Sequence, residues 1–117
     1  MMSYQLKLER CAAGKDREYV RHLFFTLLTS LGLHGRTMTE FEFYPLGLAV
    51  AVVLEESHAT MHTWPEMSEI QLDIFHCGEL VDDFEEVLID QVNQLFLPGN
   101  ITGVVVDRNT MEIITAF

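Results

Sequence analysis

Residues 46–75 read LGLAVAVVLEESHATMHTWPEMSEIQLDIF, and the two ends of this stretch decide the fold. Residues 46–54 form an apolar run rich in β-branched side chains and too short for a typical helix, which predicts a strand covered on both faces. Residues 68–75 alternate apolar and polar side chains, which predicts a half-buried strand. The two strands bracket a polar segment, EESHATMHTWPE, at residues 55–66.

The rest of the chain adds further strands and two helices. Residues 4–8 and 37–44 alternate as strands do, and residues 104–106 and 111–115 predict a final hairpin. Apolar residues at three- and four-residue spacing predict two amphipathic helices, the first ending at Gly32 and the second at Pro98 and Gly99. The two apolar stripes consist of Val20, Leu23, Phe24, Leu27, Leu28 and Leu31, and of Val81, Phe84, Leu88, Val92 and Leu95.

This order of elements predicts an α+β fold: a two-layer sandwich with a mainly antiparallel sheet and two helices on one face. A chain of 117 residues without internal repeats predicts a single domain over residues 1–117. The other face of the sheet needs cover, above all at residues 46–54. A homodimer with its sheets packed face to face, in four layers α/β/β/α, would supply that cover.

Charge narrows the classes of partner. The chain has 7 Lys and Arg against 18 Asp and Glu, a formal charge of −11, which argues against nucleic acid and anionic membranes and favours a small cationic ligand. Cys11 and Cys77 are far apart in sequence and are expected to be free thiols in a reducing compartment. Because no long apolar segment or signal peptide is recognised, we expect a cytoplasmic protein.

Candidate chemistry is concentrated in residues 55–78. His58 and His62 would share one face of a helix and could bind a metal, but Pro65 and the strand-like flanks argue against a helix there. Cys77 with a nearby histidine, His62 or His76, could form a nucleophilic pair, although a lone cysteine beside a histidine is more often packing. Spacing alone leaves both interpretations open.

A third interpretation comes from resemblance. ESHATMHTWPE at residues 56–66, followed by DIFHCG at residues 73–78, resembles the ESHxxxHTWPE and DxFxCG signature of the S-adenosylmethionine decarboxylase family, in its small prokaryotic form. The resemblance implies a lyase that makes its own cofactor: Ser57 attacks the preceding carbonyl, the chain is cleaved between Glu56 and Ser57, and Ser57 becomes a pyruvoyl group. A β chain of residues 1–56 and an α chain of residues 57–117 would result, and no metal is implied.

The same resemblance implies roles for four further residues. His62 is the base of self-processing, and Cys77 is the proton donor after decarboxylation. Phe43 stacks on the adenine of the substrate, and Glu66 holds the ribose hydroxyls. The implied activity is decarboxylation of S-adenosylmethionine through a Schiff base to the pyruvoyl group, which supplies aminopropyl groups for spermidine.

Two positions depart from the family pattern. Ala49 stands where the family has a serine that assists self-processing, so that slow or absent cleavage of this chain is one expectation. Ala59 stands where a larger apolar residue is usual beside the pyruvoyl group. The alternatives are therefore a pyruvoyl-dependent decarboxylase of ornithine or arginine, and an unprocessed homologue that binds a ligand or regulates a partner decarboxylase.

Overall fold

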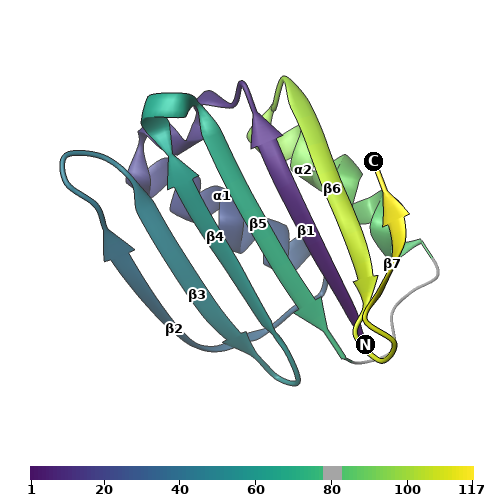
Figure 1. The fold of residues 1–117 in the computed structure, drawn as a ribbon. Coiled ribbons are helices and arrows are strands. Elements are labelled where there is room, and N and C mark those ends of the chain that lie inside the picture. Colours follow the sequence, from purple (N-terminus) through teal and green to yellow (C-terminus); the bar gives the residue numbers. More distant parts are fainter. Residues whose placement is uncertain (78–82) are drawn as a thin grey trace.

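Within residues 1–77 and 83–117, which the computed structural model describes, seven strands form one antiparallel sheet. Their order across the sheet is β2-β3-β4-β5-β1-β6-β7, and two α-helices cover the far face in Figure 1. The strands are β1 (Met2–Glu9), β2 (Gly35–Glu42), β3 (Leu48–Leu54), β4 (His58–Trp64), β5 (Glu69–His76), β6 (Asn100–Asp107) and β7 (Glu112–Ala116). The helices are α1 (Arg17–Ser30) and α2 (Phe84–Phe96), with short 3-10 helices η1 (Ala12–Lys15) and η2 (Pro65–Met67). The predicted α+β architecture is confirmed.

Local sequence explains where α1 begins and ends. The Asp16 side chain accepts a hydrogen bond of 3.1 Å from the backbone N–H of Tyr19, which caps the first turn. The helix is followed by Gly32 at φ +73°, a left-handed conformation that favours glycine. The residues that α1 buries are five of the six predicted: Val20, Leu23, Phe24, Leu27 and Leu28.

The second helix follows its predicted apolar stripe with one change. Phe84, Leu88 and Val92 are buried as expected, and Phe96 completes the buried face. Leu95 is only partly buried and packs at the edge of the core. The predicted stripe also included Val81, which lies outside the described residues.

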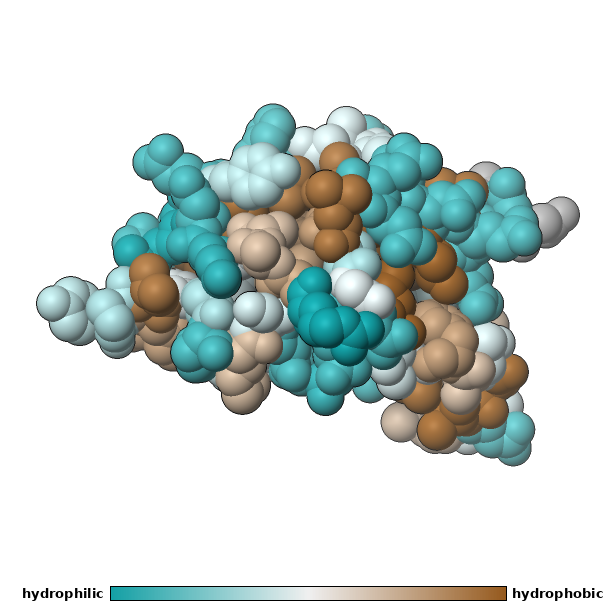
Figure 2. Space-filling model, turned by 90° about the horizontal axis from the view of Figure 1, so that it is seen from above, coloured by the Kyte–Doolittle hydropathy of each residue, from teal (hydrophilic) through white to brown (hydrophobic). Residues whose placement is uncertain are grey.

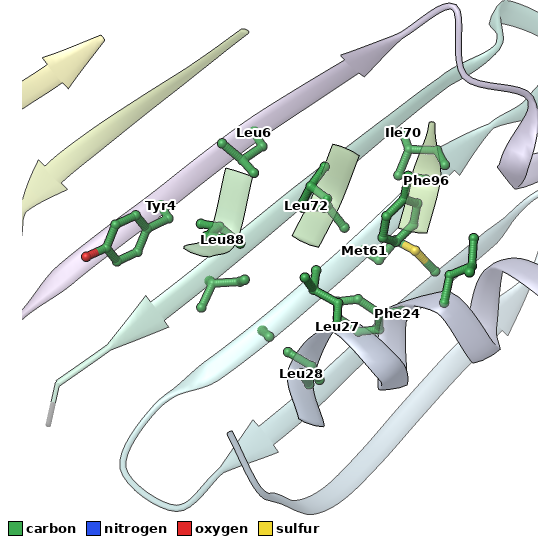
Figure 3. Packing of buried hydrophobic residues seen from close by; sticks show 14 of the residues in the cluster. Tyr4, Leu6, Phe24, Leu27, Leu28, Met61, Ile70, Leu72, Leu88 and Phe96 are labelled. Carbon is green, nitrogen blue, oxygen red and sulfur yellow. The ribbon is translucent and has the colours of Figure 1, made fainter. Parts of the chain in front are cut away.

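The hydrophobic core lies between the two helices and the sheet. Figure 3 shows Phe24 and Leu27 from α1 next to Met61 of β4, with Leu88 and Phe96 from α2 beside Leu72 and Ile70 of β5. Each of these side chains is at most 2% exposed, and burial of one such side chain contributes about 1.5–3 kcal/mol. The core therefore holds the two helices against one face of the sheet, and the opposite, helix-free face takes no part in it.

The sequence interpretation missed one strand. It treated residues 55–66 as a segment between two strands, whereas His58–Trp64 forms β4, paired to both β3 and β5. Ala59 and Met61 on this strand face the core, but the opposite face carries His58 and His62 in place of the apolar or charged residues that make an alternation obvious. The sheet therefore has seven strands where six were expected.

The helix-free face of the sheet is largely uncovered in one chain. Along β3, the side chains alternate between the core and this face, and Val53 is 51% exposed on it. Within one chain, residues 46–54 are therefore covered on one face only, and the face-to-face homodimer stays a prediction.

Further exposed apolar side chains lie on β7, at Ile113 and Ile114, where Figure 2 shows hydrophobic residues gathered on the right. No helix among the described residues is long and apolar enough to span a membrane.

Candidate active site

The predicted cleavage site lies in a tight turn between β3 and β4. The backbone N–H of Leu54 donates a hydrogen bond of 2.8 Å to the carbonyl of Ser57, so that only Glu55 and Glu56 form the loop. Both glutamates are exposed, and Ser57 is half-buried. The Glu56–Ser57 peptide bond therefore lies at the turn that joins β3 to β4 (Figure 1).

Cys77 contacts this turn directly. Its Sγ donates a hydrogen bond of 2.6 Å to the carbonyl oxygen of Glu56. The register explains the contact: His58 is opposite Phe75, so the chain that leaves β5 passes beside the turn that enters β4. A thiol that donates to this oxygen draws electrons from the carbonyl carbon and makes it easier to attack.

Two cavities concern the predicted site residues. One of about 480 Å³ is lined by His62 and Trp64 among others, and a smaller one of about 320 Å³ lies at Ser57. This Ser57 cavity is lined by Gly32, Leu33, His34, Leu54, Glu55, Glu56, Ser57 and His76. Glu56 gives it negative charge, which suits a cationic ligand, whereas Glu55 is already paired with Arg36. Ala59 does not line it, and its side chain is fully buried in the core.

The other predicted site residues gather elsewhere, in what we call the aromatic cluster: Phe43, His62 and Trp64. The His62 and Trp64 rings are stacked, with centroids 3.9 Å apart and planes 6° apart. Phe43 stacks on His62 with centroids 5.1 Å apart. Trp64 thus packs against the imidazole of His62. Glu66 is exposed on η2, two residues past Trp64, so it lies at the same end of the sheet.

The structure thus separates the predicted residues into two groups. His58 and His62 lie four residues apart along β4, which is about 13 Å in an extended strand, and Ser57 lies beyond His58. Within one chain, His62 is therefore out of reach of Ser57. The same separation prevents His58 and His62 from binding one metal ion together, and no group of three or more potential metal ligands is found in the described part of the chain.

Sequence reasoning missed a polar group on the helix-free face, centred on Asp73 of β5. Partial burial raises the pKa of Asp73, and the charge of His58, a hydrogen bond with Ser3 and the charge of Arg108 act against that rise. The Arg108 guanidinium carbon lies 4.7 Å from the centroid of the Phe75 ring. An aspartate in an alternating strand normally indicates a solvated face, so only the pairing of strands could reveal this environment.

The fold defines a class of protein. The chain is similar to the crystal structure of the adenosylmethionine decarboxylase from Aquifex aeolicus, with a TM-score of 0.75 and 24% identity, over 89% of this chain and 86% of that one. It therefore has the α+β sandwich of the adenosylmethionine decarboxylases. A more distant likeness, with a TM-score of 0.59 and 12% identity, links it to the corresponding structure from Trypanosoma brucei.

Sequence comparison gives the family. The family model for S-adenosylmethionine decarboxylase matches residues 4–109. The chain is 30% identical to the S-adenosylmethionine decarboxylase proenzyme of Clostridium tetani over 83% of this chain and 75% of that protein. It is also 30% identical to S-adenosylmethionine decarboxylase proenzyme 2 of Bacillus cereus, over 86% of this chain and 80% of that protein. The chain belongs to the S-adenosylmethionine decarboxylase family, and the predicted family is confirmed.

Proposed function

We propose that this protein is a self-processing, pyruvoyl-dependent decarboxylase of S-adenosylmethionine. The observation that carries the proposal is the hydrogen bond of 2.6 Å from the Cys77 thiol to the carbonyl oxygen of Glu56. This carbonyl belongs to the Glu56–Ser57 peptide bond, which processing would cleave. Membership of the family and the proenzyme names of the relatives support it. The product would supply aminopropyl groups for spermidine.

Processing would begin at the turn that holds Ser57. The Ser57 hydroxyl attacks the Glu56 carbonyl carbon, a C–O bond forms, and the C–N bond breaks to give an ester and a free amine. The base His62 then removes the α-hydrogen of Ser57, the bond between Cβ and Oγ breaks, and Glu56 leaves as a carboxylate. Water hydrolyses the remaining enamine, through its imine form, to a ketone and ammonia. The products are chains of 56 and 61 residues.

The surroundings of Ser57 fit a pyruvoyl group. The position is half-buried beside the Ser57 cavity, which has room for the amino-acid part of a substrate. When formed, the group supplies a carbonyl that accepts the electron pair left by carbon dioxide. Cys77 holds a proton on Sγ next to this position and can deliver it to the carbon that lost carbon dioxide. The Glu56 carboxylate would attract the positive charge of a sulfonium substrate.

The aromatic cluster would bind the nucleoside. Phe43 and His62 present stacked rings, and a purine is a flat ring that binds by the same stacking. Glu66, exposed at the same end of the sheet, offers a carboxylate that can accept hydrogen bonds from both ribose hydroxyls. These residues would then set the specificity for adenosine, and decarboxylation would take place at Ser57.

We propose that the complete site forms between two copies of the chain. One copy would provide Ser57 and Cys77, and the other would provide His62, Phe43 and Glu66. The argument is the distance of about 13 Å along β4 between His58 and His62 together with the uncovered sheet face. Two antiparallel copies packed on that face would bring the base of one to the turn of the other.

One observation favours a second candidate, an unprocessed homologue that binds a ligand or regulates a partner decarboxylase. Ala49 is the register partner of His62, so the methyl group stands beside the base where the family pattern has a hydroxyl. Without that donor the ester would form slowly. The ornithine or arginine alternative loses its support, because it rested on Ala59.

Intact mass of the purified protein under denaturing conditions tests the proposal, followed by release of carbon dioxide from carboxyl-labelled S-adenosylmethionine. Two chains, the longer one starting with pyruvoyl, and release of carbon dioxide are expected. A single chain that stays uncleaved on long incubation would contradict the proposal and favour the second candidate. The variant Ser57→Ala is the control and should remain one chain.

A further inference from the structure

The first turn of α1 carries an arginine that reaches a distant loop. Arg17 lies at the start of the helix, and its guanidinium contacts residues 43–47, which we call the Phe43 loop. Its Nε donates a hydrogen bond of 3.0 Å to the carbonyl of Gly47, and one Nη donates to the carbonyl of Pro45 at 3.1 Å. The same Nη also donates to the carbonyl of Phe43. One side chain thus binds three carbonyls of a five-residue loop.

Apart from the Phe43 ring, which contacts His62 and Phe41, few side chains of the loop are buried. Tyr44 is 97% exposed and Leu46 is 50% exposed, so burial of apolar side chains contributes little to its order. A backbone hydrogen bond of 3.0 Å from Phe43 to Gly47 closes it. Gly47 has φ +114°, a conformation that other residues rarely adopt. The Phe43 ring holds one end of the loop to the sheet, and the guanidinium holds the loop backbone to α1.

Local electrostatics argue against a cation at this position. The N-terminal turn of a helix carries partial positive charge and favours acidic side chains. Arg17 is nevertheless there, with a carboxylate oxygen of Glu42 3.8 Å from its guanidinium. Its contacts with the loop carbonyls give a physical reason for the arginine, because a guanidinium presents several N–H donors in one plane.

We propose that Arg17 is a positioning residue that fixes Phe43 at stacking distance from His62 and so sets the affinity for the adenine part of the substrate. The inference rests on the proposed function only in assigning adenine to this stack. The geometric chain is continuous: Arg17 binds the Phe43 carbonyl, the Phe43 ring stacks on His62, and His62 stacks on Trp64. Loss of the guanidinium would free the loop and weaken nucleoside binding without touching Ser57.

Fluorescence of Trp64, the single tryptophan of the chain, gives a binding assay that does not depend on catalysis. Adenosine is titrated into the wild type and into Arg17→Gln, Arg17→Lys and Arg21→Gln. Arg21 is the matched control, because it lies one turn further along α1 and pairs with side chains of β2, including Glu40 at 2.8 Å. Circular dichroism and the Tm of every variant check that it folds.

Arg17→Gln should raise the Kd for adenosine about ten-fold and the KM for S-adenosylmethionine by a similar factor, with kcat within about two-fold. Arg17→Lys should be intermediate, because one ammonium cannot bind three carbonyls equally well. Arg21→Gln should bind adenosine as the wild type does. In a Phe43→Leu background, Arg17→Gln should have no further effect on the Kd for adenosine.

An unchanged Kd in Arg17→Gln, or an equal effect in the Phe43→Leu background, would overturn the role of Arg17. If the wild type releases carbon dioxide in that case, the proposed function stands and only the inference fails. If the wild type binds adenosine with the expected dependence on Arg17 but releases no carbon dioxide, the inference stands and the decarboxylase proposal fails.

Discussion

Ala49 and His62 lie directly opposite each other, as register partners on β3 and β4. Both side chains point to the helix-free face, where directly opposite Cβ atoms are about 4.5–5.5 Å apart. The two positions that the family pattern links to self-processing are thus neighbours in space, although they are 13 residues apart in the sequence. A methyl group occupies the place from which a hydroxyl could act together with the imidazole.

Ala49→Ser should speed self-cleavage. A hydroxyl at this position can donate a hydrogen bond to the oxyanion formed when Ser57 attacks, and such a donor changes rates by about 10²–10³. We expect an increase of at least about ten-fold in the first-order rate, measured by the time course of the two chains on a denaturing gel.

Ala51→Ser is the matched control for this experiment. Ala51 lies two residues further on the same face of β3, opposite Thr60, so that its hydroxyl would be displaced from His62 along the strand. Its cleavage rate should equal that of the wild type. Equal acceleration by both substitutions would show that the effect does not depend on the position opposite His62.

Cys77→Ala should affect both stages of the proposed function. Loss of the hydrogen bond to the Glu56 carbonyl should slow cleavage, and loss of the proton donor should reduce turnover of the cleaved protein by at least about 100-fold. Rates of cleavage and of carbon dioxide release are measured separately. Cys11→Ala is the control: this thiol is buried and donates to the carbonyl of Phe96, so its loss should lower the Tm and leave both rates unchanged. Full activity of Cys77→Ala would exclude the thiol as the acid.

Much of the fold could be predicted because its determinants are local. The helices and most strands bury apolar residues at regular spacing, and Asp16 and Gly32 mark the ends of α1. β4 was not predicted, because its open face carries His58, Thr60 and His62, and such polar side chains do not give the clear alternation of a half-buried strand.

The sequence was enough to predict which residues belong to the candidate site, but not how they are arranged in space. Motif spacing identified Ser57, His62 and Cys77, but an extended strand places His62 away from the other two, and a count of residues cannot reveal this before β4 is recognised. The contact between Cys77 and Glu56 depends on the register of β4 against β5. Long-range pairing of this kind leaves no local signal in a single sequence.

Asp73→Asn should stabilise the protein at neutral pH. Burial raises the pKa of Asp73 in the folded state, against the opposing effects of His58, Ser3 and Arg108. A folded-state pKa above the unfolded one favours folding at low pH, and this stability is lost as the pH rises through the folded pKa. At neutral pH the ionised carboxylate therefore lowers the free energy of unfolding.

The measurement is Tm by calorimetry at pH 4 and pH 7. Asp73→Asn should gain in Tm relative to the wild type at pH 7 and gain less, or lose, at pH 4. Glu112→Gln, at an exposed position of β7, should follow the wild type at both pH values. A lower Tm for Asp73→Asn at pH 7 would mean that the ionic contacts of Asp73 outweigh its desolvation.

Two inactive variants should restore cleavage when they share a dimer. Ser57→Ala has no nucleophile and His62→Ala has no base, so neither should be cleaved alone. If the site combines Ser57 of one copy with His62 of another, a mixed dimer has one complete site, in which the His62→Ala chain supplies Ser57 and the Ser57→Ala chain supplies His62. Coexpression with two different affinity tags and intact mass of the mixed dimer should therefore show cleavage of the His62→Ala chain alone. A site within one chain predicts no cleavage of either chain in the mixed dimer. If the mixed dimer stays intact while the wild type is cleaved, His62 is not a base supplied by the second copy. The separation of about 13 Å along β4 makes cleavage in the mixed dimer the expected result.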